Sequence, residues 1–492
     1  MKKRNNRFLA GTLAGLMMLT MLPVTALAAQ EGADDDAASD TSNNIVNVVS
    51  DGKNVQQAEN NNVNVERNGD TENAQESADD RSGDTENVQK SADDSSGELA
   101  PTPTPAVGSF VAKIVTETGI QTYDTLDAAI EAAESGAEIE IGNDEGVITV
   151  NEIRKNLVIN GNGHTITIPD QEKTDHRSLN IYASLTFNNT KVKFVNNLDD
   201  TNVWSATVNA NSVLTLDQGS ICTMENHGIY AENGAIINVK GQSKLMVKNT
   251  TYTALMADDG FANLNIEDGS EITITDAFHG SSPQANGINN FKIRVINSYL
   301  TVTHCENQGL VRCELTLDKS NAEISGNDMG ITGYADTNVL TMKNGATLLI
   351  KDNAHSGIFM HGGNVDVQDG TALTITGTGN SVSKEVVEGY YVGALAIRTA
   401  DPANANVRFA DNATVNLVDN AVSAIRNCGM IEIGADTVIT NNGSKTQYGG
   451  GIRNYGEITV SAGAQLYNNH ALMAGDDIYN GTYKYKTYTC DG

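Results

Sequence analysis

Residues 236–250 read IINVKGQSKLMVKNT, and residues 262–276 read ANLNIEDGSEITITD. In both stretches apolar side chains alternate with polar ones in a short run, and a second alternating run follows a Gly-containing turn. Alternation with a period of two is typical of β-strands that have one buried face. The two stretches therefore predict a pair of short strands that recurs along the chain.

The same register recurs from residue 214 to residue 466. Each repeat begins with two apolar residues separated by one position, and a further apolar residue usually follows eight positions after the first. A turn-forming residue usually lies five positions after the first, and an Asn or Asp usually lies 11 to 13 positions after it. A third short strand often follows, as in GIYAEN (228–233) and GIRNYG (451–456). The apolar pairs are Leu214/Leu216, Ile237/Val239, Leu264/Ile266, Leu315/Leu317, Leu340/Met342, Val365/Val367, Val407/Phe409, Ile431/Ile433 and Ile458/Val460, with weaker ones at Leu157/Ile159, Leu185/Phe187 and Leu300/Val302.

One such repeat has exposed strand edges and cannot be stable alone, whereas stacked repeats pair those edges and align their apolar residues. We therefore expect an all-β solenoid with three strands per coil and about 12 coils over residues 157–482. A β-sandwich would not require the fixed eight-residue offset. Residues 483–492 are either a terminal cap or a truncated continuation of the solenoid.

A helix is expected over residues 125–135, within an N-terminal cap that covers residues 108–156. Asp124 is the expected N-cap residue and Gly136 the residue that ends the helix. Leu126, Ala129, Ile130 and Ala133 recur at helical spacing and form one apolar face. This face is expected to cover the first coil.

The N-terminal quarter of the chain predicts export. Residues 1–28 have a basic start, an apolar run and Ala26-Leu27-Ala28, which is typical of a cleaved signal peptide. Residues 29–107 are predicted to be a disordered acidic linker, because they are rich in Asp, Asn, Ser and Glu and end in a Pro-containing spacer. We expect a secreted protein with no membrane insertion after signal cleavage, and cell-wall association stays open.

The formal net charge of −30 disfavours nucleic acid and anionic lipid as partners, because the protein surface repels phosphate groups. The five cysteines are too few, and odd in number, for a disulfide framework. Cys222 occupies an apolar slot of the repeat and is expected to be a core residue, whereas Cys305 and Cys313 could pair if they are adjacent.

A family resemblance rests on TYDTLDAAIEAAESGAEIEIG (122–142), NLVINGNGHTITI (156–168), GGGIRNYGEITVSAGAQLYNN (449–469) and the intervening repeats. These segments resemble right-handed parallel β-helix domains of the pectin lyase-like superfamily. More narrowly, they are similar to uncharacterised adhesin-like, secreted or cell-surface proteins of Gram-positive bacteria. The resemblance covers residues 110–480 and implies a fold more firmly than a function, because the superfamily contains lyases, hydrolases and non-catalytic adhesins.

Polysaccharide enzymes of this fold need clustered carboxylates, or a base with carboxylate-bound Ca²⁺. The sequence has only Asp476-Asp477 and His361-Gly362-Gly363 as partial matches, in the wrong order, and we expect a structural role for the two aspartates. No catalytic residue and no metal ligand is therefore predicted. We expect no cofactor, although weak Ca²⁺ binding by the acidic turns at residues 258–260, 267–270 and 327–330 stays open.

Two longer intervals interrupt the repeats, at residues 277–291 and 381–393. Such excursions from a rigid scaffold often carry binding residues. Tyr390 and Tyr391 are the candidate binding residues, because an aromatic ring can stack on the apolar face of a sugar. The leading hypothesis is a non-catalytic, adhesin-like display protein for a polysaccharide or host-surface ligand, of unknown oligomeric state. A polysaccharide lyase or glycoside hydrolase, and a passive stalk of a longer surface protein, are the alternatives.

Overall fold

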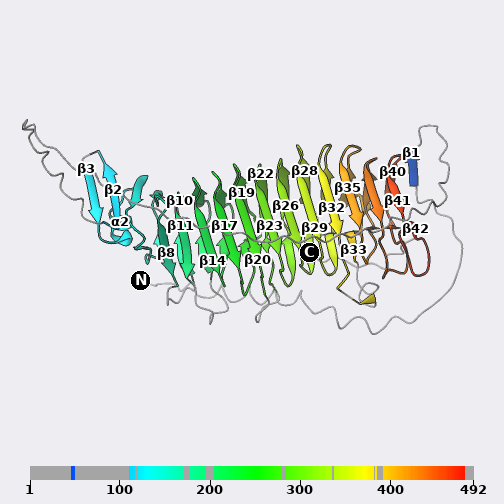
Figure 1. Ribbon diagram of the computed structural model, residues 1–492, viewed down its shortest axis with the longest axis horizontal. Coiled ribbons are helices and arrows are strands. Elements are labelled where there is room, and N and C mark those ends of the chain that lie inside the picture. The colour runs from blue at the N-terminus through cyan, green and yellow to red at the C-terminus, as the bar shows by residue number, and fades with distance from the viewer. Residues whose placement is uncertain are drawn as a thin grey trace, which may run out of the picture. The chain divides into compact units, whose positions relative to one another are not determined.

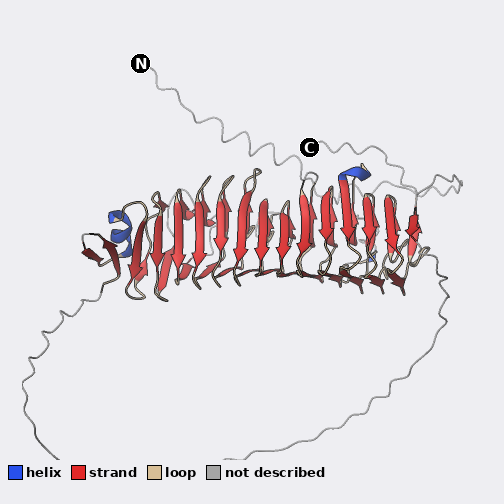
Figure 2. Ribbon diagram, turned by 90° about the horizontal axis from the view of Figure 1, so that it is seen from above, coloured by secondary structure: helices blue, strands red, loops and turns tan. Residues whose placement is uncertain are grey.

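The structure is a computed structural model that describes residues 46–49, 110–117, 119–170, 177–195, 204–278, 284–334, 337–381, 383–384, 392–399 and 401–481. Short strands wind into coils, each coil contributes one strand to each of three sheets, and the coils stack side by side along one axis (Figure 1). The predicted all-β parallel solenoid with three strands per coil is confirmed. Figure 2 shows the successive strands of a sheet as a row of near-parallel arrows.

Sheet A has 16 strands and sheets B and C have 13 each. In sheet A, the strands in chain order are β1 (Val46–Val49), β2 (Ala112–Thr116), β3 (Gly119–Tyr123), β4 (Ala137–Ile141), β7 (Leu157–Asn160), β10 (Ser184–Asn188), β13 (Val213–Asp217), β16 (Ile236–Val239), β19 (Ala262–Glu267), β22 (Phe291–Ile296), β25 (Glu314–Asp318), β28 (Asn338–Lys343), β31 (Gly363–Val367), β34 (Ala405–Phe409), β37 (Met430–Ile433) and β40 (Glu457–Ser461).

In sheet B, the strands are β5 (Gly146–Val147), β8 (Thr165–Pro169), β11 (Lys191–Val195), β14 (Ile221–Glu225), β17 (Lys244–Lys248), β20 (Glu271–Thr275), β23 (Tyr299–Thr303), β26 (Asn321–Ser325), β29 (Thr347–Lys351), β32 (Ala372–Thr376), β35 (Thr414–Val418), β38 (Thr437–Thr440) and β41 (Gln465–Tyr467). In sheet C, they are β6 (Glu152–Ile153), β9 (Arg177–Ile181), β12 (Trp204–Val208), β15 (Ile229–Ala231), β18 (Leu255–Ala257), β21 (Ile288–Asn289), β24 (Gln308–Val311), β27 (Met329–Gly333), β30 (Ser356–Met360), β33 (Gly393–Ile397), β36 (Ile425–Asn427), β39 (Ile452–Asn454) and β42 (Ile478–Asn480).

The apolar residues of the repeat line the inside of the coils. Leu214 pairs in register with Ile237, which pairs with Leu264 in sheet A, and Cys222, Leu245 and Ile272 are aligned in the same way in sheet B. These side chains are at most 4% exposed and belong to one continuous core. The eight-residue offset thus connects a sheet A strand with the sheet B strand of the same coil.

The prediction that the weaker pair Leu300/Val302 begins a coil is wrong. The two residues lie in β23 of sheet B and pair with Ile272 and Ile274. The first strand of that coil is β22, where Ile293 and Val295 pair with Leu264 and Ile266. The long interval after residue 264 therefore contains one further complete coil, which is formed by β22, β23 and β24.

A helix and an antiparallel hairpin precede the stacked coils. The helix α2 (Leu126–Ala132) is shorter than predicted, and its N-cap is Thr125 rather than Asp124, since Thr125 Oγ1 accepts a hydrogen bond from Ala128 N at 3.1 Å. It ends before Gly136, with Ala133 as C-cap. Its predicted apolar face is buried in the same core as the coils. The hairpin β2–β3 extends sheet A beyond β4 through antiparallel pairing of β2 with both neighbours.

At the other edge of sheet A, β1 pairs in parallel with β40. β1 is the one part of the predicted linker, residues 29–107, that the structure describes. The candidate terminal cap at residues 483–492 lies outside the described residues. A 3-10 helix, η2 (Pro402–Asn404), precedes β34.

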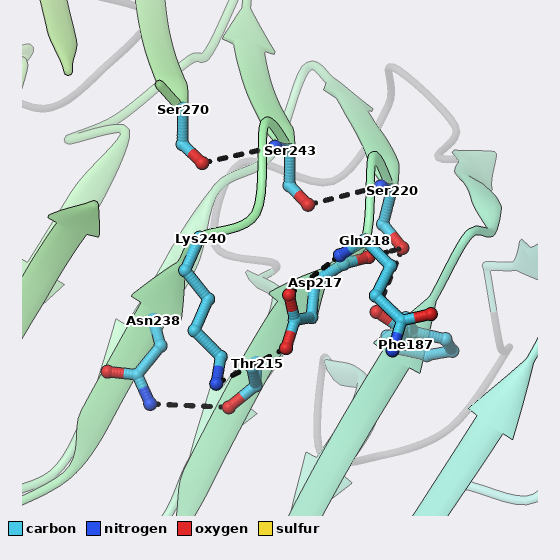
Figure 3. Close-up of polar contacts among 9 residues, drawn as sticks. All are labelled: Phe187, Thr215, Asp217, Gln218, Ser220, Asn238, Lys240, Ser243 and Ser270. Carbon is cyan, nitrogen blue, oxygen red and sulfur yellow. Dashed lines mark hydrogen bonds and ion pairs between the residues drawn. The ribbon is translucent and has the colours of Figure 1, made fainter. Parts of the chain in front are cut away.

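A row of buried serines connects successive coils at the turn between sheets A and B (Figure 3). Ser220 N donates to Ser243 Oγ, and Ser243 N donates to Ser270 Oγ, both at 3.1 Å. The row continues from Thr190 N, which donates to Ser220 Oγ, to Ser298 N, which donates to Ser320 Oγ. Each side-chain oxygen thereby satisfies a backbone N–H that the turn leaves outside the sheet ladders.

Replacing Ser243 by alanine is expected to lower the free energy of unfolding by about 0.5–1.5 kcal/mol, because the buried N–H of Ser220 loses one of its two acceptors and keeps only Asp217 O, at 3.1 Å. Urea unfolding followed by circular dichroism measures the change. A matched control is Ser461→Ala, because Ser461 Oγ bonds only to the exposed Asp411 carboxylate. Equal stability of the Ser243→Ala variant and the unmodified protein would contradict the role assigned to the row.

A second buried row, of asparagines, lies at the turn between sheets B and C. Asn442 Oδ1 accepts from Asn420 N at 3.2 Å and from Asn420 Nδ2 at 2.8 Å. Asn469 Oδ1 accepts in turn from Asn442 N at 3.1 Å and from Asn442 Nδ2 at 2.9 Å. All three side chains are at most 2% exposed. The Asn that recurs in the sequence thus connects neighbouring coils through its side chain.

A third row explains the Gly-Ile pair that begins many of the sheet C strands. A Cβ atom on Gly228 would lie 1.8 Å from the carbonyl oxygen of Ala254 in the next coil, and one on Gly330 would lie 2.4 Å from that of Gly357. Real Cβ atoms do not approach so closely. These positions require glycine because successive backbones are in direct contact there.

Candidate functional site: the aromatic face of sheet C

The predicted binding residues Tyr390 and Tyr391 lie outside the described residues, so their role stays a prediction. The other excursion is partly described. There, Tyr252 Oη donates to Gln284 Oε1 at 2.5 Å, and Thr253 Oγ1 donates to Gln284 O at 2.8 Å. The described end of this excursion is thus fixed to the turn that precedes β18.

The acidic residues singled out from the sequence are engaged in local contacts. Asp476 Oδ1 accepts from Ala471 N at 2.8 Å, and Asp477 Oδ1 accepts from Asn469 Nδ2 at 2.9 Å. Of the acidic turns, Asp258 accepts a hydrogen bond from Tyr230, and Asp328 is paired with His355. Among the described residues, no three His, Cys, Asp or Glu side chains are placed to share a metal ion. Weak Ca²⁺ binding by the acidic turns therefore stays a prediction, which calcium titration of the protein can test.

The four described cysteines are free and buried. Cys222 lies in its expected core slot, between Val192 and Leu245. Cys305 and Cys313 are not bonded to each other in the structure. Burial raises the pKa of the Cys222, Cys305 and Cys313 thiols to about 12. They are core residues.

Aromatic rings gather on the side of the protein that carries sheet C. Every ring–ring contact between described residues joins side chains of sheet C strands or of the turns next to them. Trp204 lies 5.6 Å from Tyr230 and 5.5 Å from Tyr252, measured between ring centroids. We name the set the ring row: Trp204, Tyr230, Tyr252, Tyr334, Phe359, His361, Tyr448, Tyr455 and Tyr479.

Strand register explains this arrangement. In a sheet C strand such as Ile229-Tyr230-Ala231, the first and third side chains are buried in the core and the middle one points outward. Parallel pairing then places the middle residues of successive coils next to one another, about 4.8 Å apart. These middle residues, in coil order, are Thr207, Tyr230, Met256, Asn289, Val311, Thr332, Phe359, Ala396, Arg426, Arg453 and Tyr479.

Cations accompany the rings. The guanidinium carbon of Arg312 lies 4.9 Å from the centroid of the Tyr334 ring, and that of Arg453 lies 5.5 Å from the rings of both Tyr448 and Tyr455. Stacking of this kind fixes the guanidinium and the ring relative to each other.

The outer faces of sheets A and B differ from that of sheet C, because they carry ion pairs between lysines and carboxylates. Lys244 Nζ lies 2.8 Å from a Glu271 oxygen in sheet B, and Lys240 Nζ lies 3.2 Å from an Asp217 oxygen in sheet A. Further pairs of this type are Lys113–Glu140, Lys248–Glu225, Lys292–Glu314, Lys343–Asp318 and Lys351–Glu323. Exposed pairs of this kind are typical of a solvated surface.

A groove of about 460 Å³ lies on the outer face of sheet A, over β31, β34, β37 and β40. Arg408 lies between two of its carboxylates, at 3.2 Å from Asp366 and 3.8 Å from Glu432. Glu457 and Asn406 also line the groove. This polar groove is the second candidate site.

His361 is held within the ring row. Its ring stacks on Tyr334 at 5.0 Å and meets the Phe359 ring edge-on at 4.7 Å. Burial, helped by the positive charge of Arg398, lowers the pKa of His361 to about 4. The imidazole is therefore neutral at pH 7 and cannot serve there as a cation.

The shifted pKa of His361 predicts a pH dependence of stability. Between pH 6.5 and 4 the unfolded chain binds a proton at this histidine while the folded chain does not, so this group lowers the free energy of unfolding as the pH falls through that range. Urea unfolding of the protein and of His361→Phe at pH 7 and pH 4.5 measures it. We expect the free energy of unfolding to fall less between pH 7 and pH 4.5 in the variant than in the unmodified protein. An equal fall in both would contradict the prediction.

The coils, the three parallel sheets and the outward-facing rows define the chain as a parallel β-helix protein. Comparison with protein-family profiles, with curated proteins and with solved structures finds no match. In the described part of the chain, no helix has the length and apolar character needed to cross a bilayer.

Proposed function

We propose that this protein is a secreted or surface-displayed, non-catalytic β-helix that binds a polysaccharide or a host-surface glycan through the ring row. The proposal agrees with the resemblance to adhesin-like proteins of the pectin lyase-like superfamily. The observation that carries it is the gathering of rings on one side, next to two faces that carry ion pairs. Aromatic side chains present a broad apolar surface with polar edges, which suits the faces of sugar rings.

The scaffold suits this role because it fixes the rings in place. Each ring stands on a strand or turn of the stacked coils and contacts another ring, so less side-chain entropy is left to lose when a ligand binds. Trp204, Tyr230 and Tyr252 are half-buried and already in mutual contact. The rings form three groups along sheet C, around Trp204, His361 and Tyr479, and a glycan could contact the neighbouring coils of one group at once.

The alternative, a polysaccharide lyase or glycoside hydrolase, is favoured by the sheet A groove, because Asp366, Glu432 and Glu457 bring three carboxylates to its lining. Enzymes that cleave glycosidic bonds use carboxylates as acid, base or nucleophile. A passive stalk is the third reading, and it requires no ligand.

One experiment separates these functions. The purified full-length protein is applied to immobilised plant, mucin and microbial polysaccharides, with and without Ca²⁺, while retention, new reducing ends and unsaturated uronide absorbance are followed. The proposal predicts retention without product release. Product release would support the enzyme, and neither retention nor product would support the stalk.

Substitution then locates the binding surface. Trp204→Leu is expected to weaken retention about ten-fold, because removal of a tryptophan anchor from a binding surface typically costs more than about 1 kcal/mol. Tyr299→Leu is the matched control, since Tyr299 is an exposed aromatic residue of sheet B. Equal loss in both variants would contradict binding at sheet C.

A further inference from the structure

The two ends of the solenoid differ. At the N-terminal end, α2 covers the first coil, and its apolar residues Leu126, Ala129 and Ile130 are buried in the core that the coils share. At the other end, β40, β41 and β42 form the last coil that the structure describes. The terminal repeat of a solenoid needs a cover, because its strand edges and core residues otherwise face water.

Core positions of the last coil are exposed. Ile452 in β39 is 0% exposed, whereas Ile478, which pairs with it in register from β42, is 38% exposed. Leu466 in β41 is only partly buried, although it pairs with the fully buried Ile439. Among the described residues, no strand follows β41 in sheet B or β42 in sheet C. Each of these side chains therefore occupies a slot that a following coil covers elsewhere in the protein.

The turn between β41 and β42 adds apolar surface to the same end. Leu472 N and Met473 N donate to Thr446 O and Gln447 O of the preceding coil, at 2.9 and 3.0 Å, so the turn is fixed against that coil. The side chains of Leu472 and Met473 are 47% and 66% exposed. An exposed apolar patch of this kind is typical of a protein–protein contact. We name the patch the end face: Leu466, Leu472, Met473 and Ile478.

A row of asparagines reaches the last coil beside the end face. Asn427 Nδ2 donates to Asn454 Oδ1 at 2.8 Å, and Asn454 Nδ2 donates to Asn480 Oδ1 at 3.0 Å, so each amide donates to the next coil. No described residue accepts a hydrogen bond from Asn480 Nδ2. Because an amide both donates and accepts, two Asn480 side chains are suited to pair with each other.

The end face suits a second copy of itself. Another last coil supplies matching apolar residues and a matching asparagine, whereas the first coil of a second copy is covered by α2. Two last coils would therefore meet about a two-fold axis, which closes the assembly at a dimer. This contact also limits repulsion between two acidic chains. Most of each solenoid, which is about 60 Å long, then lies farther from the other than the Debye length of about 8 Å.

β1 occupies part of this end of the solenoid (Figure 1). It pairs with β40 in a register that places Val46 and Val48 opposite Ile458 and Val460. Ile458 is 2% exposed, unlike Ile478 in sheet C. β1 thus stands where a following coil would place its sheet A strand. If two copies met with both β1 strands in place, their last coils would be about 14 Å apart, and the end faces could not touch.

β1 is held by few residues and closes a long loop. Its four residues pair with β40 alone, and residues 50–109 connect it to the opposite end of the solenoid. This connection can span about 60 Å, because an extended chain covers about 3.3 Å per residue. Closing so long a loop has an entropic cost that the pairing of four residues must offset. We therefore expect β1 to leave more readily than a strand inside a sheet.

We propose that the end face is a docking surface for a second copy of this chain, and that β1 blocks it. Release of β1 exposes the edge of β40 and lets two end faces meet, so that a monomer becomes an end-to-end dimer. This inference does not depend on the proposed glycan binding.

The test is sedimentation velocity of the full-length protein over a wide range of concentration. We expect a monomer for the unmodified protein and a dimer for the double variant Asn47→Pro/Val48→Pro. Proline has no N–H for the ladder, and adjacent residues of a strand direct their N–H groups to opposite sides, so at least one proline faces β40. Deletion of residues 46–49 is the second variant and is expected to give the same dimer. Electron microscopy of that dimer is expected to show two rods in line.

A matched variant checks that the effect belongs to β1. Asn64→Pro/Val65→Pro makes the same substitutions in the similar stretch Val63-Asn64-Val65, which lies outside the described residues. This variant is expected to stay a monomer. A dimer of equal strength in this variant would overturn the role of β1.

A second pair of variants locates the contact. Met473→Glu, added to the double proline variant, is expected to weaken the dimer at least about ten-fold, because the contact would bury an unpaired carboxylate. Met246→Glu in the same background is the control, since Met246 is exposed on the outer face of sheet B, and the dimer is expected to persist. Equal weakening by the two glutamates would overturn docking at the end face. Unfolding midpoints equal to that of the parent show that each variant is folded.

Other outcomes of the same measurements also decide against the proposal. A monomeric double proline variant, or an unmodified protein that dimerises equally well, would overturn it. If only removal of residues 482–492 produces the dimer, that segment rather than β1 blocks the end face, and the proposal is wrong. Species larger than a dimer, or rods that lie side by side, would overturn the two-fold contact between last coils.

Discussion

Replacing Asn442 by leucine is expected to lower the free energy of unfolding by about 4 kcal/mol or more. The Asn442 amide donates to Leu417 O, Thr440 O and Asn469 Oδ1, at 2.8–2.9 Å. Its oxygen accepts both Asn420 bonds described above. Leucine has a similar volume but leaves these buried groups without that partner, and each unsatisfied group costs about 1–3 kcal/mol.

The control is Asn406→Ala on the outer face of sheet A. Asn406 Nδ2 also bonds to an asparagine of the preceding coil, Asn364, at 3.3 Å, but this contact is exposed to water. A change within about 0.5 kcal/mol is expected there. Urea unfolding followed by far-ultraviolet circular dichroism measures both variants, and hydrogen exchange at the Asn420 amide reports the local opening. A similar decrease in the free energy of unfolding for the two variants would show that burial of the asparagine row contributes nothing to stability.

Replacing Gly228 by alanine is expected to cost at least about 3–4 kcal/mol or to prevent folding. The added Cβ would lie 1.8 Å from the Ala254 carbonyl oxygen, which also accepts the hydrogen bond from Ile229 N at 2.9 Å. Neither backbone can move without breaking the pairing of β15 with β18. Substitutions that force a packed backbone apart are among the most destabilising.

Gly146→Ala is the matched control. The nearest atom to an added Cβ there is Ile166 Cγ1 at 3.5 Å, which is an ordinary contact, and its backbone has no positive φ. We expect stability within about 1 kcal/mol of the unmodified protein, with a gain if the unfolded chain becomes less flexible. Soluble yield and the unfolding midpoint of the two alanine variants provide the comparison. Equal yield and equal unfolding midpoints for Gly228→Ala and Gly146→Ala would contradict the close contact between Gly228 and the Ala254 carbonyl oxygen.

The sequence predicted the coil because period-two alternation and a fixed offset report the same physical fact, which is that equivalent residues pair across neighbouring coils. One near miss shows the limit of a fixed offset. Eight positions after Leu315 the apolar slot holds Glu323, because the turn there is one residue shorter and Ala322 fills the slot opposite Leu348. The offset measures turn length as well as strand register, and turn length varies.

Part of the ring row can be predicted from the sequence, from the residues that follow the isoleucine of each third strand. The segments GIYAEN and GIRNYG predict third strands, and each carries an aromatic or arginine side chain directly after its isoleucine. Composition does not reveal the ring row. Aromatic residues make up only 5% of the chain, and a percentage cannot show that they gather at the outward positions of one sheet. The sequence instead favours Tyr390 and Tyr391 as binding residues, because they are adjacent aromatic residues in a segment that interrupts the repeats.

The dependence of each coil on its two neighbours alone has an evolutionary consequence. Duplication or loss of one repeat would change the number of coils while every remaining serine, asparagine and glycine contact kept an equivalent partner. The row of outward-facing residues on a sheet would then gain or lose one residue, while the fold stayed the same. Arg426 and Arg453 stand in equivalent Ile-Arg-Asn strands, β36 and β39, and duplication of a single coil would produce such a pair in one step. A lineage could thus change these outward residues one coil at a time.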